Sequence, residues 1–228
     1  MILLYDLVFQ DDRRPSPYCW RTKFALAHKG LKWTEEPTGF TEKHKIAFAG
    51  SQTVPVITDG EKSVKDSWAI ALHLDRAHPG NPLFESETAR VHGRFVANWV
   101  DTSVQGTLFP LIVGDLYDRV RPADHDYFRE SRGKRLGTAD FQGFQAKARE
   151  KGVAAFRAVL EPARRLLKEQ LFLAGAQPGY PDYALAGAFM WSRIASPLTL
   201  LETDDPVHAW RERMLDLFGG MGRRAKAA

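Results

Sequence analysis

The first 80 residues alternate between strand-like and helix-like patterns in one order, and that order restricts the fold more than any other feature of the chain. Residues 2–8 (ILLYDLV) are aliphatic and aromatic, which is typical of a short β-strand. Residues 15–17 (PSP) then open a helical stretch that Gly30 closes, because proline favours the first turn of a helix and glycine the position after its end. Residues 31–36 predict a second strand.

A hairpin and a second helix follow. Residues 54–57 (VPVI) predict a strand, residues 59–60 (DG) a tight turn, and residues 62–64 the partner strand. Asp66 and Ser67 stand where a helix N-cap belongs, directly before the apolar-periodic run WAIALHLDRAH. A β-α-β unit followed by a β-β-α unit is the thioredoxin-like arrangement.

The rest of the chain carries a different pattern. Residues 78–84 (HPGNPLF) contain two prolines and a glycine and predict a linker. No strand pattern follows Ser86, and long helical patterns cover residues 89–116, 141–169, 182–194 and 206–218. We therefore predict an α/β thioredoxin-like domain over residues 1–80 and an all-α domain over residues 86–228, with the linker at about residues 78–85.

Composition excludes several classes of protein. Hydrophobic residues make up 44% of the 228 residues and charged residues 26%, as in a globular protein. No apolar run reaches the roughly 18 to 20 residues that span a bilayer, and the N-terminus lacks a signal-peptide pattern, so we expect no membrane partner. A single cysteine excludes an internal disulfide and favours a cytoplasmic location.

The distribution of charges and the spacing of the histidines argue against two further classes, nucleic-acid-binding proteins and metalloproteins. The net charge is +4, but acidic residues interrupt the basic ones, and residues 119–135 predict a solvated mixed-charge face. We therefore expect no nucleic-acid partner. The seven histidines show none of the spacings of a metal site, so we predict no bound metal.

Residues 16–19 (SPYC) resemble a C-x-x-C redox motif in which Ser16 replaces the first cysteine. In a thioredoxin-like fold this position lies at the N-terminus of the first helix, where unpaired N–H groups and the helix dipole stabilise an anion. Serine cannot form a disulfide, but its hydroxyl can donate a hydrogen bond to the thiolate of a bound molecule, whose free pKa is about 8.5. Glutathione is the abundant cytosolic thiol that such a site would bind. The alternative is that Ser16 only caps the helix.

With these motifs the chain resembles the glutathione S-transferases over nearly its whole length. SPYCWRTKFAL is similar to the S-P-[FY]-x-x-[RK] segment of the serine-type classes, which implies that Ser16 is the catalytic, thiol-activating residue. Val54 and Pro55 match the pair with a cis-proline that binds the cysteinyl part of glutathione, and Asp66 and Ser67 match the pair that binds its γ-glutamyl group. The resemblance implies glutathione as co-substrate, no metal and a homodimer.

Further segments are similar to the glutathione-dependent β-aryl-etherases of lignin-degrading bacteria and to the related fungal FuA transferases. They are NWV (98–100), DHDYFRESR (124–132), DYALAGAFMW (182–191) and the ending at residues 203–222. In the etherase reaction the glutathione sulfur attacks a carbon that bears an aryloxy group, and a phenol leaves. Asp182 matches an acidic residue that caps a buried helix, where Gly179 replaces the usual Ser or Thr, and we expect it to serve folding.

The residues that bind the electrophile are expected in the cleft between the domains. The candidates are aromatic or small polar side chains near the end of the first strand and on the first long helix, since aromatic rings suit an aryl substrate. The predicted pocket residues are Phe9, Tyr18, Trp99, Ser103 and Phe109, with Gln10, Pro15, Tyr117 and Trp191 as further options. Aromatics at helical spacing also occur as ordinary core residues, and Cys19 is predicted to be buried and unreactive.

The sequence therefore predicts a glutathione S-transferase acting on a small hydrophobic, aromatic electrophile. Two alternatives stay open. The first is a non-catalytic binder of apolar ligands or glutathione conjugates. The second is a thiol-disulfide reductase, against which the serine at position 16 argues.

Overall fold

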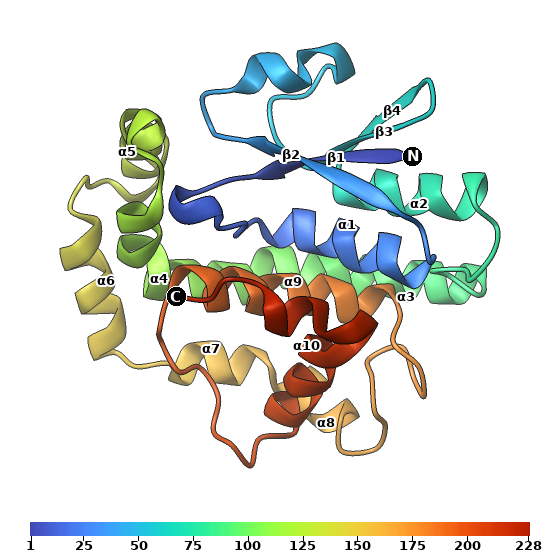
Figure 1. The fold of residues 1–228 in the computed structure, drawn as a ribbon. Helices are drawn as coiled ribbons and strands as arrows, with labels where there is room; N and C mark the ends of the chain where they lie inside the picture. Colours follow the sequence, from blue (N-terminus) through green and yellow to red (C-terminus); the bar gives the residue numbers. More distant parts are fainter.

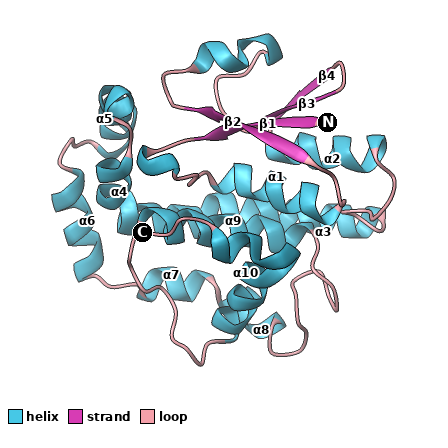
Figure 2. Cartoon of the chain, in the orientation of Figure 1, coloured by secondary structure: helices cyan, strands magenta, loops and turns pink.

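The N-terminal domain is built on a four-stranded sheet with the strand order β2-β1-β3-β4. In the computed structural model, which describes residues 1–228, β1 (Ile2–Leu7) runs parallel to β2 (Trp33–Thr38) and antiparallel to β3 (Val56–Asp59), and β3 pairs with β4 (Lys62–Lys65). These strands are the only ones in the chain and form one layer (Figure 2). The helices α1 (Pro17–His28) and α2 (Ser67–Ala77) cover one face of this sheet, and the 3-10 segment η2 (Lys43–Ala49) lies beyond the other (Figure 1).

This order of elements is the predicted thioredoxin-like arrangement, and its local signals lie where the sequence indicated. Ser16 is the N-cap of α1, Pro17 is its first residue, and Asp66 is the N-cap of α2. The second strand begins at Trp33, two residues later than predicted, because Leu31 still belongs to the turn that closes α1 through its N–H bond to the Leu26 carbonyl.

The C-terminal domain is entirely helical, as predicted. Its segments are α3 (Glu87–Trp99), a π-helical turn η3 (Val100–Val104), α4 (Gln105–Arg119), a 3-10 turn η4 (Pro122–Asp124), α5 (His125–Leu136), α6 (Phe141–Glu150), α7 (Ala154–Val159), α8 (Glu161–Leu166), α9 (Tyr180–Ala195) and α10 (Pro206–Arg224). A further 3-10 turn, η1 (Gln10–Asp12), follows β1 in the N-terminal domain. None of these helices is both long and apolar enough to cross a membrane.

Two predictions for this domain need correction. The single helix expected over residues 141–169 is wrong, because Gly152 takes a left-handed conformation (φ 73°) that ends the first segment, and Pro162 starts another. The solvated face expected over residues 119–135 is also wrong in part. Asp124 and Phe128 are buried, since α5 turns a row of side chains spaced by four residues toward the N-terminal domain.

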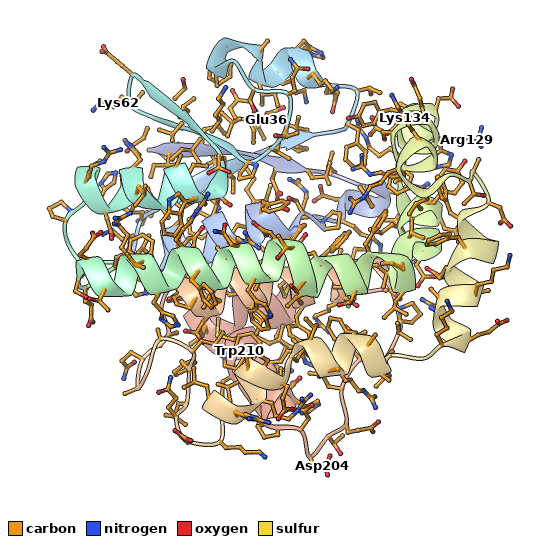
Figure 3. All side chains as sticks on the ribbon, turned by 180° about the vertical axis from the view of Figure 1, so that it is seen from behind. Glu36, Lys62, Arg129, Lys134, Asp204 and Trp210 are labelled. Carbon is orange, nitrogen blue, oxygen red and sulfur yellow. The ribbon has the colours of Figure 1, made fainter.

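The two domains share one continuous hydrophobic core. The rings of Phe24 on α1 and Tyr183 on α9 are stacked with centroids 5.6 Å apart. The two helices come close together at Gly187, where a Cβ atom would lie 2.3 Å from the carbonyl oxygen of Pro17. Behind this contact, Trp210 lies among the helices of the C-terminal domain (Figure 3) and donates its indole N–H to Asp182 at 2.8 Å.

Asp182 has the folding role that the sequence indicated. Its buried carboxylate accepts N–H bonds from Gly179, Leu173 and Ala174, besides the bond from Trp210. Because Gly179 offers no side chain, the only side-chain cap at the start of α9 is this carboxylate, which accepts the N–H of Gly179.

Candidate functional site

A cavity of about 760 Å³ lies between the two domains. The N-terminal domain contributes the end of β1, the N-termini of α1 and α2, and the loops on either side of η2. The helical domain contributes residues of η3, α4, α5 and α9, whose positions can be followed in Figure 1.

The structure brings most of the predicted site residues to this cavity. Its lining includes Phe9, Ser16, Tyr18, Val54, Pro55, Asp66, Ser67, Phe109 and Trp191. The prediction for Trp99 and Ser103 is corrected, because neither lines the cavity, and the further options Gln10, Pro15 and Tyr117 do not line it either. Asp101, Gln105 and Phe109 occupy the cavity face of this helix at four-residue intervals, so Trp99 and Ser103 point elsewhere.

Ser16 is both a helix cap and a wall of the cavity. Its Oγ accepts the N–H of Cys19 at 3.2 Å, and the side chain is 4% exposed. A hydroxyl that accepts one hydrogen bond keeps its own proton to donate. Next to it, the N–H of Tyr18 has no partner within the chain. Unpaired N–H groups of this kind form the positive end of the α1 dipole. This corner of the cavity is therefore suited to an anion.

Cys19 lies outside the cavity. Its side chain is fully buried, and its Sγ is 4.0 Å from the carbonyl oxygen of Tyr5. Burial raises the pKa of the Cys19 thiol well above its ordinary value, and the nearby carboxylate of Asp6 adds to the shift. A thiol in this position stays protonated and unreactive, as the sequence led us to expect.

The loop before β3 offers unpaired backbone to the cavity. The peptide bond between Val54 and Pro55 is cis. Neither the N–H nor the carbonyl of Val54 makes a backbone hydrogen bond within the chain, although Val54 lines the cavity. These groups suit an extended peptide that would pair with them as a neighbouring strand does.

At the N-terminus of α2, Asp66 offers a carboxylate and Ser67 offers an unpaired backbone N–H. Oδ1 of Asp66 accepts the N–H groups of Trp68 and Ala69, each at 3.0 Å, which leaves Oδ2 free. The N–H of Ser67, at the first helical position, has no partner in the chain. A carboxylate next to a free helix N-terminus suits a ligand group that carries an ammonium and a carboxylate together.

An ion pair that the sequence did not indicate forms the floor between the domains. Arg21 is 2% exposed, and its guanidinium donates to Asp101 at 2.5 and 3.3 Å and to the carbonyl of Ala184 at 3.3 Å. Gln105 also donates to Asp101, at 3.0 Å. Arg21 is the arginine of the S-P-Y-x-x-R motif, but nothing in the sequence around it predicts a contact with an aspartate 80 residues away.

The wall contributed by α5 was also missed. The ring of Phe40 lies 5.8 Å from that of Phe9 and 6.0 Å from that of Phe128. Across the cavity lining, Phe109 and Trp191 are stacked at 5.9 Å. The lining residues that sequence reasoning did not identify include Phe40, Lys43, Tyr127, Phe128, Arg132 and Arg135.

Comparison with known proteins gives a consistent result. The family description "Glutathione S-transferase, N-terminal domain" matches residues 12–82, and "Glutathione S-transferase, C-terminal domain" matches residues 93–212. A curated relative, glutathione S-transferase U13 of Arabidopsis thaliana, is 30% identical over 93 residues. That match spans 38% of this chain and 41% of the plant protein.

Solved structures resemble the chain over nearly its whole length. The glutathione transferase GSTFuA3 of Phanerochaete chrysosporium is 25% identical with a TM-score of 0.77, and the match covers 96% of this chain and 92% of that one. A glutathione S-transferase of Ceriporiopsis subvermispora, CsGST63524, solved in complex with glutathione, has the same fold at 21% identity, with a TM-score of 0.75 and coverage of 98% and 94%.

Proposed function

The chain belongs to the glutathione S-transferase family, and from that premise we propose that it uses Ser16 to hold a glutathione thiolate for attack on an aromatic electrophile. The observation that carries the proposal is the Ser16 hydroxyl, which accepts the N–H of Cys19 and lies at an anion-suited corner of the cavity between the domains. A hydrogen bond to the sulfur favours its charged form and so lowers the pKa of the thiol.

The other predicted site residues of the N-terminal domain would orient the glutathione tripeptide. The ammonium and carboxylate of the γ-glutamyl group fit Asp66 and the N–H of Ser67, and the cysteinyl backbone fits the unpaired groups of Val54. Pro55 lines the cavity next to Val54. Binding through several remote groups fixes the sulfur near Ser16, which turns the attack into a step within one complex.

The aromatic lining supports an aryl substrate. Phe9, Phe40, Phe109 and Trp191 supply ring faces on which a planar electrophile can stack. In the transferase reaction the thiolate forms a C–S bond and the leaving group departs with its electron pair. In the β-etherase version the broken bond is C–O, and the departing phenolate takes a proton from water.

We also propose that the protein is a homodimer. The side chains of Phe95 and Val91 on α3 are 71% and 56% exposed, and Phe48 on η2 is 55% exposed. Large exposed apolar side chains on one helix suit contact with a second copy.

The Ser16→Ala variant tests the proposed mechanism. We expect glutathione to bind with nearly unchanged affinity, because the tripeptide's other groups hold it, while the thiolate absorbance of the complex titrates at higher pH and turnover of chlorodinitrobenzene falls. A β-aryl ether, assayed with and without glutathione, tests the etherase version separately. Binding of glutathione and its conjugates without turnover of either substrate would identify a binding protein instead, and an unmoved titration would show that Ser16 is only a cap.

A further inference from the structure

Two arginines of α5 reach the cavity from the helical domain. Arg132 is half-buried and Arg135 lies one turn further along the helix, and both line the cavity. The other basic side chains of this helix differ. Arg129 contacts Tyr117 instead and projects from the outer edge of α5 (Figure 3), outside the cavity lining. The inward pair is therefore a property of one helix face and not of a generally basic helix.

Arg132 is held between aromatic rings and has no acidic partner. Its guanidinium carbon lies 5.3 Å from the ring centroid of Phe40 and 5.4 Å from that of Phe128. Its hydrogen bond within the chain goes to the neighbouring Ser131 hydroxyl at 3.1 Å, and no carboxylate lies within ion-pair distance. Burial lowers the pKa of Arg132, the nearby Tyr127 hydroxyl acts against this, and the like charge of Arg135 lowers the pKa further.

Arg135 also lies over an aromatic ring, that of Phe109 on α4. Its guanidinium carbon lies 5.0 Å from the ring centroid of Phe109, and its side chain makes no hydrogen bond or ion pair within the chain. Stacking on a ring uses the face of a guanidinium, whereas its N–H donors lie in the plane at the edge. Both arginines therefore keep donors that can bind a carboxylate in the planar, bidentate geometry.

The other charged groups of the cavity lining do not pair with the two arginines. Of the acidic residues, Asp101 is engaged by Arg21, and Asp66 lies at the N-terminus of α2. Of the basic ones, Lys65 donates to the carbonyl of Gly50, and Lys43 lies over the ring of Tyr127. The arginines lie with Phe40, Phe109 and Phe128, the rings of the electrophile side. Two cations that have no carboxylate partner and lie beside aromatic rings suit a ligand that is aromatic and carries an anion.

We propose that Arg132 and Arg135 form a subsite for a carboxylate carried by the aromatic electrophile, so that the preferred substrates are aryl carboxylates. The inference rests on the proposed transferase function and adds the chemical class of its second substrate. The aryl ring stacks on the phenylalanines, and the carboxylate takes up the free N–H donors. The reacting carbon then faces the sulfur held by Ser16.

A matched pair of electrophiles tests this subsite. With 4-chloro-3-nitrobenzoate, the thiolate forms a bond to the ring carbon that bears chlorine, chloride leaves with the bonding electrons, and the thiol proton has already passed to the buffer. The methyl ester of the same compound reacts in the same way but carries no charge. With each rate divided by its uncatalysed rate, we expect the enzyme to favour the acid.

The variants Arg132→Gln and Arg135→Gln should each lower kcat/KM for the acid by about 10- to 100-fold, the effect of losing a charge-assisted hydrogen bond. The kcat/KM for the ester and the KM for glutathione should each change by less than about two-fold. Arg132→Lys keeps the charge without the planar fork and should recover only part of the loss. Arg129→Gln removes a charge from the same helix outside the cavity, and it should leave kcat/KM unchanged for both the acid and the ester. Because Arg135 is exposed, its variant is expected to fold normally.

Three results would overturn the inference while leaving the transferase function intact. These are equal corrected rates for acid and ester, equal losses on both in the variants, or a raised KM for glutathione, which would assign the arginines to glutathione's own carboxylate. If neither electrophile is turned over, the transferase function fails, and equilibrium binding decides the subsite. Calorimetry should then show biphenyl-4-carboxylate binding more tightly than its carboxamide, with the difference lost in Arg132→Gln. Equal affinities would exclude the subsite.

Discussion

The carboxylate of Asp124 accepts hydrogen bonds from both the backbone N–H and the hydroxyl of Thr41, at 2.8 and 2.7 Å. This contact joins the loop after β2 to the start of α5, and Arg121 reinforces it by binding Asp124 at 2.9 Å and Glu42 at 3.0 Å. A Cβ atom at Gly39 would lie 1.6 Å from the guanidinium of Arg121, so a larger residue there would require the Arg121 side chain to move. The α5 wall of the cavity is thereby held against the N-terminal domain.

The Asp124→Asn variant should weaken this junction in a pH-dependent way. Burial alone would raise the pKa of Asp124, but the hydrogen bonds from Thr41 and the guanidinium of Arg121 outweigh it, so the pKa is lowered from 3.8. The ionised carboxylate therefore stabilises the fold above pH 3.8, and this contribution disappears as the pH falls through the lower folded-state value. We expect a loss of about 1–3 kcal/mol at neutral pH. Urea unfolding from pH 7 to 3 should show the difference from wild type shrinking, whereas a constant difference would mean that shape and not charge matters.

Gly187→Ala should disturb the seam between the domains. The added methyl would lie 2.3 Å from the Pro17 carbonyl, a backbone atom that cannot rotate away, so α1 must shift next to Ser16. Overpacking of this kind costs about 1–3 kcal/mol. Thermal unfolding should show a lower midpoint, and turnover should fall. Gly106→Ala is the matched control, since its Cβ would meet nothing within 4 Å, and a similar loss there would remove the explanation by contact.

Asp66 and Ser67 should each matter for glutathione affinity. Loss of a charge-assisted hydrogen bond in Asp66→Ala or Ser67→Ala should weaken binding by about 10- to 100-fold, as measured by calorimetry. Asp66 also caps α2, so Asp66→Asn, which keeps the capping oxygen, separates the charge from the cap. Lys62→Ala, on the hairpin tip (Figure 3), should leave affinity unchanged. Unaltered binding in both alanine variants would assign the γ-glutamyl group to another site.

Ser16→Cys should convert the site to disulfide exchange. A cysteine at the N-terminus of α1 is expected to be partly thiolate at neutral pH. It would attack oxidised glutathione, form a mixed disulfide and release one glutathione thiolate. Intact-mass spectrometry should show one added glutathione, with or without a Cys19→Ala change, and conjugating activity should be mostly lost. A variant that stays unmodified would place residue 16 away from the glutathione sulfur.

Phe95→Asp should prevent dimer formation. The change places a charge on the exposed apolar face of α3, where a second copy would have to desolvate it. Light scattering should report a dimer for the wild type and a monomer for the variant. Phe48→Asp tests whether η2 belongs to the same interface, and a wild-type monomer would exclude the proposed assembly.

Much of the N-terminal domain could be predicted because its signals are local. The strand patterns, the proline at the start of α1 and the caps Ser16 and Asp66 act between residues a few positions apart. The proline and the caps lie in the structure where the sequence indicated, whereas β2 and β3 each begin two residues later than predicted. The family motif extended this to the residues that meet at the cavity, including Val54 and Ser67. The caps and strands follow from the chain's own short-range chemistry, whereas the meeting of Val54 and Ser67 at one site was implied by the family resemblance.

The helical wall of the cavity was decided by tertiary structure. Which side chains of the long helix face the cavity follows from its packing between the domains, and Asp101 and Phe109 line the cavity while Trp99 does not. Asp101 meets Arg21 across 80 residues, and Asp124 meets Thr41 across 83. A pattern of charges and aromatic rings along one helix does not show which face will be covered. That choice depends on packing between segments far apart in the chain, and it alone turned Arg132 from a surface charge into a residue of the site.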